Sequence, residues 1–261
     1  MEFRPCIDIH NGQVKQIVGS SLADEENRAE ENFVALRDAA FYARFYKQKG
    51  IKGGHIILLN PASSNYYEAT RAQALKALAA YPKGLQVGGG VNAENASNYL
   101  EAGASHVIVT SYVFREGRID MEHLEKICKE VGREHLVLDL SCRMKDGEYY
   151  IVTDRWQKFT EEVVKDSILN LLKGYCDEFL IHAVDVEGKN QGIEQKLAQQ
   201  LGTWCSKPDS IAITYAGGVH SYEDIDRLRD FGKNRLNVTI GSALDIFGGD
   251  LIFDEVTRRI G

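Results

Sequence analysis

Two aspartates follow short apolar runs and are the first candidates for chemistry. Asp8 comes after Cys6-Ile7, and Asp139 comes after Val137-Leu138. Burying a carboxylate at the end of a core strand is costly unless it is paired or used, and burial raises its pKa toward neutrality. Two opposed carboxylates can act as general base and general acid, which a sugar isomerisation through an enol requires. The alternative is that each aspartate caps a loop or pairs with Lys15 or Arg143.

Two glycine pairs with neighbouring hydroxyl groups suggest phosphate binding. Gly89-Gly90 and Gly217-Gly218 each lie between an apolar run and a helical pattern, and the following strands end in Thr110-Ser111 and Gly241-Ser242. Glycine lets backbone N–H groups approach an anion closely, and the hydroxyls add donors. The alternative is a tight turn at each pair. Two such sites imply a long ligand with a phosphate at each end.

The helices that follow the glycine pairs should direct their positive ends toward the same anions. Asn92 or Asn95 is expected to open the first of these helices, and Ser221 the second. Unpaired N–H groups at helix starts attract negative charge.

Short apolar runs alternate with amphipathic segments along the whole chain. We expect buried parallel strands because the runs are too short for helices and rich in Val and Ile. They lie near residues 3–8, 55–59, 85–87, 106–110, 136–140, 179–182, 211–215 and 238–240. Helical spacing of apolar residues separates them, as in Met121, Leu124, Ile127, Cys128 and Val131, or Val164, Ile168, Leu171, Leu172 and Tyr175. About eight such units, with no GxGxxG after the first strand, predict an α/β fold of the (β/α)8 TIM-barrel type as one domain over 1–261.

A repeat strengthens the prediction of a barrel. Gly217 follows Gly89 by 128 positions, and Asp139 follows Asp8 by 131. The IVTS and TIGS motifs are also 131 apart, and His55 and His182 are 127 apart. We therefore predict two half-barrel repeats, approximately 1–131 and 132–261.

Composition excludes several classes of protein. A hydrophobic fraction of 44%, a charged fraction of 26% and a formal net charge of -7 are typical of a globular chain and disfavour a nucleic-acid-binding surface. Five widely spaced cysteines disfavour a disulfide framework. With no apolar leader or membrane-length stretch, we expect a cytoplasmic protein that contacts neither nucleic acid nor membrane. No exposed heptad or interface stripe is evident in the sequence, which favours a monomer.

No cofactor or metal is expected from sequence motifs. The chain has no P-loop, no HExxH and no Cys or His spacing suited to a metal. His55 and His182 are assigned to the barrel wall.

The stretches CIDIHNGQVKQIVG, LQVGGGV, IVTS, AGGV and IGSALDIFGG together resemble the ProFAR isomerase family of histidine biosynthesis. The likeness extends from Pro5 to Ile260, and DLSCR and GSALDIFGG are similar to the divergent fungal and plant branch. It implies an aldose-ketose isomerase that performs an Amadori rearrangement of a bisphosphorylated aminoaldose, ProFAR, to the aminoketose PRFAR without a cofactor.

The resemblance also implies roles for individual residues. Asp8 matches the general base and Asp139 the general acid, while Trp156 in DRWQ matches a tryptophan that stacks on the imidazole carboxamide. The remaining residues expected to bind substrate are Lys15, Gly19, Gly89, Gly90, Thr110, Ser111, Gly188, Gly217, Gly218, Gly241 and Ser242.

Several positions depart from the family pattern. LDLSCRMKDGEYY replaces a shorter stretch after the fifth strand, so Ser141 is an alternative match for the catalytic aspartate. A threonine expected after the sixth strand is missing, which leaves Asp185, Lys189 or Asn190 as substitutes. Leu58 removes an interior carboxylate, and Asn92 replaces an arginine.

Three other functions remain open from sequence. The cyclase subunit of imidazole glycerol phosphate synthase is a sister duplication with two aspartates, although Trp156 favours the isomerase. A noncatalytic phosphosugar-binding barrel would need the glycine pairs without the aspartates. An isomerase that also accepts phosphoribosyl anthranilate would use the same rearrangement.

Overall fold

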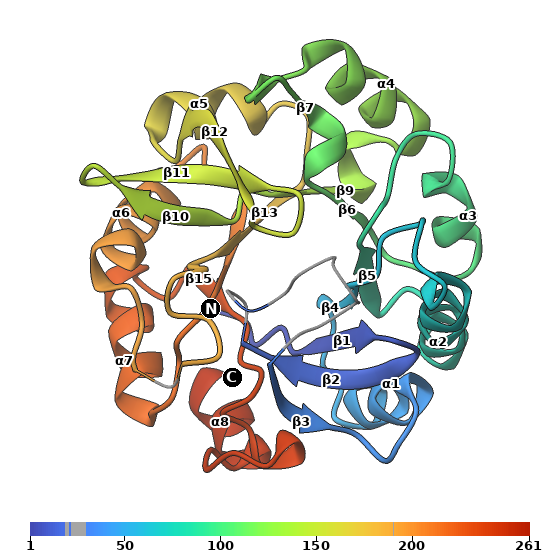
Figure 1. Cartoon of the computed structure of the whole chain (residues 1–261). Helices are drawn as coiled ribbons and strands as arrows, with labels where there is room; N and C mark the ends of the chain where they lie inside the picture. Colours follow the sequence, from blue (N-terminus) through green and yellow to red (C-terminus); the bar gives the residue numbers. More distant parts are fainter. Residues whose placement is uncertain (19–20, 22–29, 190) are drawn as a thin grey trace.

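Eight parallel strands form a closed ring at the centre of the molecule (Figure 1). The computed structural model describes residues 1–18, 21, 30–189 and 191–261. The strands pair in chain order: β1 (Cys6–His10), β4 (Gly54–Leu58), β5 (Leu85–Gly88), β6 (Val107–Val109), β9 (Leu136–Asp139), β13 (Glu178–His182), β14 (Ala212–Ala216) and β15 (Leu236–Val238). A parallel bridge between Phe3 and Val238 closes the ring, and the Arg4 N–H donates to the Val238 carbonyl at 2.9 Å. The predicted TIM barrel is confirmed, with each strand within a few residues of its predicted place.

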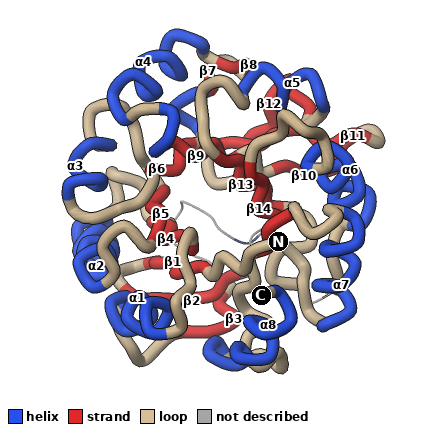
Figure 2. Tube along the Cα trace, turned by 180° about the vertical axis from the view of Figure 1, so that it is seen from behind, coloured by secondary structure: helices blue, strands red, loops and turns tan. Residues whose placement is uncertain are grey.

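Helices surround the strands on the outside, as both views show (Figure 1, Figure 2). They are α1 (Ala39–Gln48), α2 (Tyr67–Ala80), α3 (Ala96–Glu101), α4 (Met121–Val131), α5 (Asp166–Leu172), α6 (Gln195–Cys205), α7 (Tyr222–Phe231) and α8 (Phe253–Ile260), with the 3-10 turns η3 (Ser111–Val113), η4 (Arg133–His135) and η5 (Asp245–Phe247). The Asp120 carboxylate caps α4 by accepting from the His123 N–H at 3.1 Å, and Ser221 caps α7 as predicted. The α4 side chains Leu124, Ile127 and Val131 are buried, because the helical spacing places them on one face. No helix among the described ranges is long and apolar enough to cross a membrane.

Antiparallel strands extend the barrel in segments where the sequence pattern predicted no strands. They are β2 (Gln13–Ile17) and β3 (Glu31–Val34) after β1, β7 (Phe114–Arg115) and β8 (Arg118–Ile119) after β6, and β10 (Cys142–Lys145), β11 (Glu148–Thr153) and β12 (Lys158–Val163) after β9. Two-residue turns join three of these pairs: Asn11-Gly12, Glu116-Gly117 and Asp146-Gly147, all with positive φ. Such residues with glycine second favour the type I′ hairpin, so a local signal for these hairpins was present in the sequence.

A buried carboxylate joins strands near the amino-terminal end of the barrel. Glu178 is the first residue of β13, and its side chain is 3% exposed. Arg4 and Thr214 donate to it, and the Gln86 amide donates at 2.7 Å. Three donors compensate the cost of burying this charge, so the network stabilises the end of the barrel opposite the candidate site.

Candidate functional site

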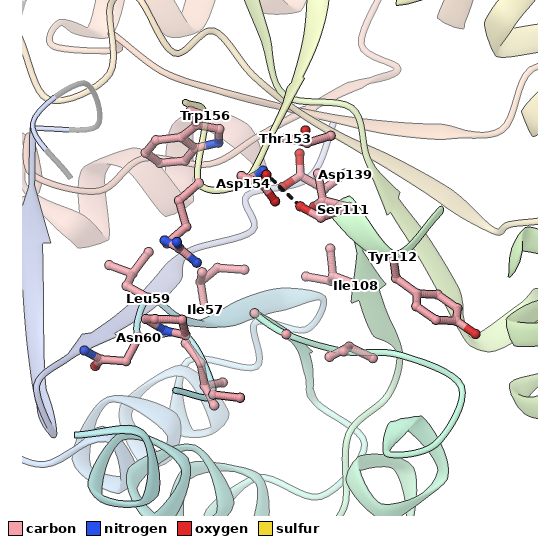
Figure 3. Close-up of a pocket in the computed structure, with 18 of the residues that line it drawn as sticks. Ile57, Leu59, Asn60, Ile108, Ser111, Tyr112, Asp139, Thr153, Asp154 and Trp156 are labelled. Carbon is pink, nitrogen blue, oxygen red and sulfur yellow. Dashed lines mark hydrogen bonds between the residues drawn. The ribbon is translucent and has the colours of Figure 1, made fainter. Parts of the chain in front are cut away.

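Two separate pockets open at the carboxyl ends of the barrel strands. The larger is lined by Gly89, Gly90, Thr110 and Ser111, together with Asp139, Trp156 and residues of β4 and its following loop (Figure 3). The smaller is lined by Glu187, Gly188, Gly217, Gly218, Val219, Thr239, Ile240, Gly241 and Ser242. The structure therefore brings each predicted phosphate motif to a concave site, one in each half of the chain.

The first glycine of each pair needs a backbone conformation that other residues rarely adopt. Gly89 has φ +99° and Gly217 has φ +117°. A Cβ on Gly89 would lie 2.1 Å from the Leu58 carbonyl oxygen, and one on Gly217 would lie 2.8 Å from the Ala183 carbonyl oxygen. Both glycines pack against the preceding barrel strand or the loop at its end, so the two positions require glycine for the same reason.

The second glycine of each pair differs in its surroundings. At Gly90 an added Cβ would meet nothing within 4 Å, whereas at Gly218 it would lie 2.2 Å from the Gly192 carbonyl oxygen. We call Gly89, Gly90, Thr110 and Ser111 the first cradle, and Gly217, Gly218, Gly241 and Ser242 the second cradle. The first cradle is open at its second glycine, and the second cradle is covered there by the loop after β13.

The helix starts after the glycines match the prediction only in part. The Asn92 side chain accepts from the Glu94 and Asn95 N–H groups at 3.0 and 3.1 Å and forms a turn. Asn95 occupies the capping position of α3 without a side-chain cap, and its amide donates instead to the Gly90 carbonyl. The asparagines therefore order the chain around the first cradle rather than capping α3 through their side chains.

Asp8 lies in the middle of β1, close to His182 and Glu187. Burial, together with the nearby Glu187 carboxylate, raises the pKa of Asp8 to about 6. Its hydrogen bond from the Gln16 amide is long, at 3.5 Å. This carboxyl group therefore changes its charge near neutral pH, as a general base requires.

Asp139 has the opposite electrostatic setting. It is the last residue of β9, and its side chain is 13% exposed. Although burial acts to raise its pKa, His182 and the hydrogen bonds from Ser141 hold the pKa below its usual value. The Ser141 N–H and hydroxyl donate to Asp139 Oδ1 at 2.8 and 2.5 Å. Because Asp139 lines the larger pocket while Ser141 is fully buried, the structure favours Asp139 over Ser141 for contact with a ligand.

His182 lies beside Ser141 and Asp139, whereas the sequence predicted only a place in the barrel wall. Its Nδ1 is 3.1 Å from Ser141 Oγ and 4.0 Å from Asp139 Oδ1. Burial alone would lower its pKa, but Asp139, Glu187 and Asp8 raise it. A signal was available, because His182 ends a predicted strand at the functional face of the barrel.

A second histidine, His55, lies close to Cys6 and Asp8. His55 of β4 pairs in register with Cys6, and the possible ligand atoms of Cys6, Asp8 and His55 lie within 4.8 Å of one another. Burial lowers the pKa of His55 to about 3 and raises that of Cys6 well above its usual value. The Gln16 amide donates to Cys6 Sγ at 3.6 Å and to Asp8 at 3.5 Å, so two members of this group share one hydrogen-bond donor. Sequence spacing could not reveal it because strand register brings its members together.

Trp156 lies at the tip of the hairpin between β11 and β12 and lines the larger pocket (Figure 3). Asp154, Arg155 and Trp156 have φ of +49°, +55° and +67°. Three consecutive residues of this kind store strain, which is common where a side chain must be held in a site. The Asp154 N–H donates to Ser111 Oγ at 3.0 Å, which fixes the hairpin to the first cradle. The Trp156 ring lies 5.6 Å from the His182 ring.

Other predicted site residues are placed elsewhere. Lys15 is buried and forms an ion pair with Glu31, so it lines neither pocket. Arg143 pairs with Asp185 at 2.9 Å, which means that neither cation proposed as a partner is paired with Asp8 or Asp139.

The loop after β13 contributes an acidic residue that no sequence motif had indicated. Glu187 lines the smaller pocket, and burial raises its pKa. Of the substitutes considered for the missing threonine, Asp185 is engaged by Arg143 and Lys189 is exposed. Gly19 and Asn190 lie outside the described residues.

Comparison with known proteins identifies relatives over nearly the whole chain. Residues 2–250 match the model of a family described as histidine biosynthesis protein. A chloroplastic 1-(5-phosphoribosyl)-5-((5-phosphoribosylamino)methylideneamino) imidazole-4-carboxamide isomerase (ProFAR isomerase) of Medicago truncatula is 51% identical over 98% of this chain and 80% of its own length. Isomerases of the same name from Yarrowia lipolytica and Saccharomyces cerevisiae are 42% and 40% identical, over 96% and 98% of this chain and 94% and 97% of their own. The family resemblance predicted from the sequence is confirmed, and this chain belongs to the histidine biosynthesis protein family.

Proposed function

We propose that this chain is a ProFAR isomerase, which converts ProFAR to PRFAR by an Amadori rearrangement. The observation that carries the proposal is the pair of pockets, each with a glycine motif, together with two aspartates of contrasting proton affinity. Each pocket offers backbone N–H groups and hydroxyls to one phosphate of a ligand phosphorylated at both ends. The names of the relatives support the same substrate.

Asp8 and Asp139 divide the proton transfers in this proposal. Asp8 acts as general base and removes the proton from C2 of the opened sugar, because its pKa of about 6 lets it accept and release a proton near neutral pH. The Asp139 carboxyl group protonates the ring oxygen as the furanose ring opens. Trp156 stacks on the flat imidazole carboxamide beside the first cradle.

The remaining substrate contacts follow the pockets. We propose that Gly89, Gly90, Thr110 and Ser111 hold one phosphate, and that Gly188, Gly217, Gly218, Gly241 and Ser242 hold the other. We further propose that the chain is a cytoplasmic monomer built from half-barrels near 1–131 and 132–261. Sedimentation of the purified protein with and without ligand tests the monomer.

The test is turnover of ProFAR by the wild type, Asp8→Asn and Asp139→Asn, with Asp209→Asn as the control. Asp209 is an exposed aspartate paired with Lys173, so its loss should leave turnover unchanged. Both site variants should lose about 10²- to 10⁴-fold in kcat while still binding PRFAR. An inactive wild type would refute the proposed function, and an active Asp139→Asn variant would transfer the acid role to Ser141 or the loop after β13. Phosphoribosyl anthranilate, assayed in parallel, tests the second substrate.

A further inference from the structure

The hydroxyl of Ser141 lies between an acid and a base. Its Oγ is 2.5 Å from Asp139 Oδ1 and 3.1 Å from His182 Nδ1. Ser141 is fully buried and His182 is 8% exposed, so bulk water has little access to the chain of contacts. A serine hydroxyl has one proton to donate and lone pairs to accept.

The available protons fix the direction of the hydrogen bonds that connect His182, Ser141 and Asp139. The Ser141 proton is directed at Asp139 Oδ1, which already accepts the Ser141 N–H at 2.8 Å. Ser141 Oγ must then accept from His182, and the proton of the imidazole belongs on Nδ1. The contacts therefore run as Nδ1–H to Oγ, and Oγ–H to Oδ1.

We propose that His182 is a positioning residue for the general acid and supplies its proton to Asp139 through the hydroxyl of Ser141. This inference rests on the proposed function, because it explains how one carboxyl group of that reaction obtains its proton. It concerns residues of β9, its following loop and β13 that come together only in the folded barrel.

The electrostatics of the pair require such a source. The pKa of Asp139 is held low, so this carboxyl group is ionised at neutral pH and has no proton of its own to give. The pKa of His182 is raised, so the imidazolium persists to a higher pH than that of an ordinary histidine. The charged or titratable groups that face His182 are Asp139 from β9, Asp8 from β1, His55 from β4 and Glu187 from the loop after β13. Three of these four are carboxyl groups, which favours the imidazolium.

The proton transfer balances without any other reactant. The Nδ1–H bond of the imidazolium breaks, Ser141 Oγ takes that proton, and the original Ser141 proton moves to Asp139. The carboxylic acid so formed protonates the ring oxygen while the bond from the anomeric carbon to that oxygen breaks and leaves its electron pair on oxygen. The lone pair of the anomeric nitrogen forms the C=N bond. The net change is one proton from His182 to the ring oxygen, with Ser141 and Asp139 restored.

The first experiment locates the proton without using turnover. Nitrogen-15 NMR of labelled protein should show His182 protonated at Nδ1 and titrating above the usual histidine pKa, and Asp139→Asn should lower that pKa. A neutral His182 with its proton on Nε2 near pH 7 would overturn the proposal. Because this experiment needs no substrate, its result is independent of whether the protein isomerises ProFAR.

The second experiment separates proton supply from packing. The amide of His182→Asn retains a hydrogen-bond donor near the place of Nδ1 but cannot release a proton, and Ser141→Ala interrupts the chain. Both should lower kcat about 10²- to 10³-fold with little change in KM, and both should lose the fall in kcat that the wild type shows as pH rises through the pKa of His182. His106→Asn is the matched control, because His106 lies at the opposite end of the barrel beside Asp177. If His182→Asn keeps the turnover and pH profile of the wild type, His182 has only a packing role and the proposal is wrong. Wild-type inactivity on ProFAR, by contrast, would refute the proposed function and leave the NMR result to decide the position of the proton.

Discussion

The two halves of the barrel place an aspartate on equivalent strands and give it opposite proton affinity. Asp8 on β1 receives one long hydrogen bond from Gln16 and has its pKa raised to about 6. Asp139 on β9 receives two short hydrogen bonds from Ser141, lies near His182 and has its pKa lowered. The strands are equivalent, so the difference comes from the segments that follow them. The two strands thus hold carboxyl groups of different proton affinity because the neighbours of those groups differ.

The largest expected effect is on the pH dependence of kcat/KM. We expect kcat/KM of the wild type to fall about tenfold for each pH unit below 6, because Asp8 must be ionised to act as the proposed base and its pKa is about 6. In Asp8→Asn this dependence should vanish together with most of the activity, and in Asp139→Asn the acid limb should remain. Rate measurements from pH 4.5 to 8 decide the matter, and an acid limb retained by Asp8→Asn would assign it to another group such as Glu187.

The two second glycines provide the next largest contrast. Gly218→Ala should destabilise the fold by about 2–4 kcal/mol, because positive φ strain adds to a clash with the Gly192 carbonyl oxygen. Gly90→Ala should cost only about 1 kcal/mol, since its Cβ would enter open space. It should nevertheless raise KM, because the methyl group occupies the cradle. Urea unfolding and kinetics on both variants test this, and equal losses of stability would contradict the contrast.

Replacing each of the two aspartates by asparagine should change the free energy of unfolding in opposite directions. The folded pKa of Asp8 lies above its unfolded value, so its contribution to stability falls as pH rises from about 4 to 6. Asp8→Asn should therefore be more stable than the wild type by about 3 kcal/mol at pH 7 and nearly equal to it at pH 4.

Asp139 should behave in the reverse manner. Its lowered folded pKa contributes stability that is present above its unfolded pKa and is lost as pH falls through the folded pKa. Asp139→Asn should be less stable than the wild type by about 1–3 kcal/mol at pH 7, because Ser141 and His182 lose a charged partner. Denaturant titrations at both pH values measure each variant, and two shifts of the same sign would refute the contrast.

The smallest expected effect is a difference in unfolding free energy between alanine variants of Ser111 and Ser242. Ser111→Ala removes the acceptor of the Asp154 N–H and should lower the free energy of unfolding by about 1 kcal/mol without ligand. Ser242→Ala should change it little, because the Ser242 hydroxyl makes no such bond within the described part of the chain. Thermal unfolding of the two variants compares them directly, and the hairpin that carries Trp156 should become more mobile only in Ser111→Ala.

The sequence predicted the barrel strands and the position of both glycine motifs after strands because each depends on local pattern and chain order. The fold class and family are confirmed by the comparisons and the closed sheet. Lys15 was expected to contact substrate, yet it pairs with Glu31 because the β2–β3 hairpin, which was not predicted, brings the two together. His182 and Glu187 were not predicted as site residues, because only the folded barrel brings them close to the two aspartates. The long stretch after β9 gave no indication that Ser141 would bond to Asp139, since that contact depends on the geometry of a single turn.

The buried network around Glu178 has a consequence for the engineering of this chain. Arg4 and Gln86 come from the first half, whereas Glu178 and Thr214 come from the second. If the gene were cut between the halves, one fragment would retain an unpaired buried carboxylate and the other its unused cation. The fragments would then need each other to fold, so splitting this chain near its middle should abolish independent folding of either half.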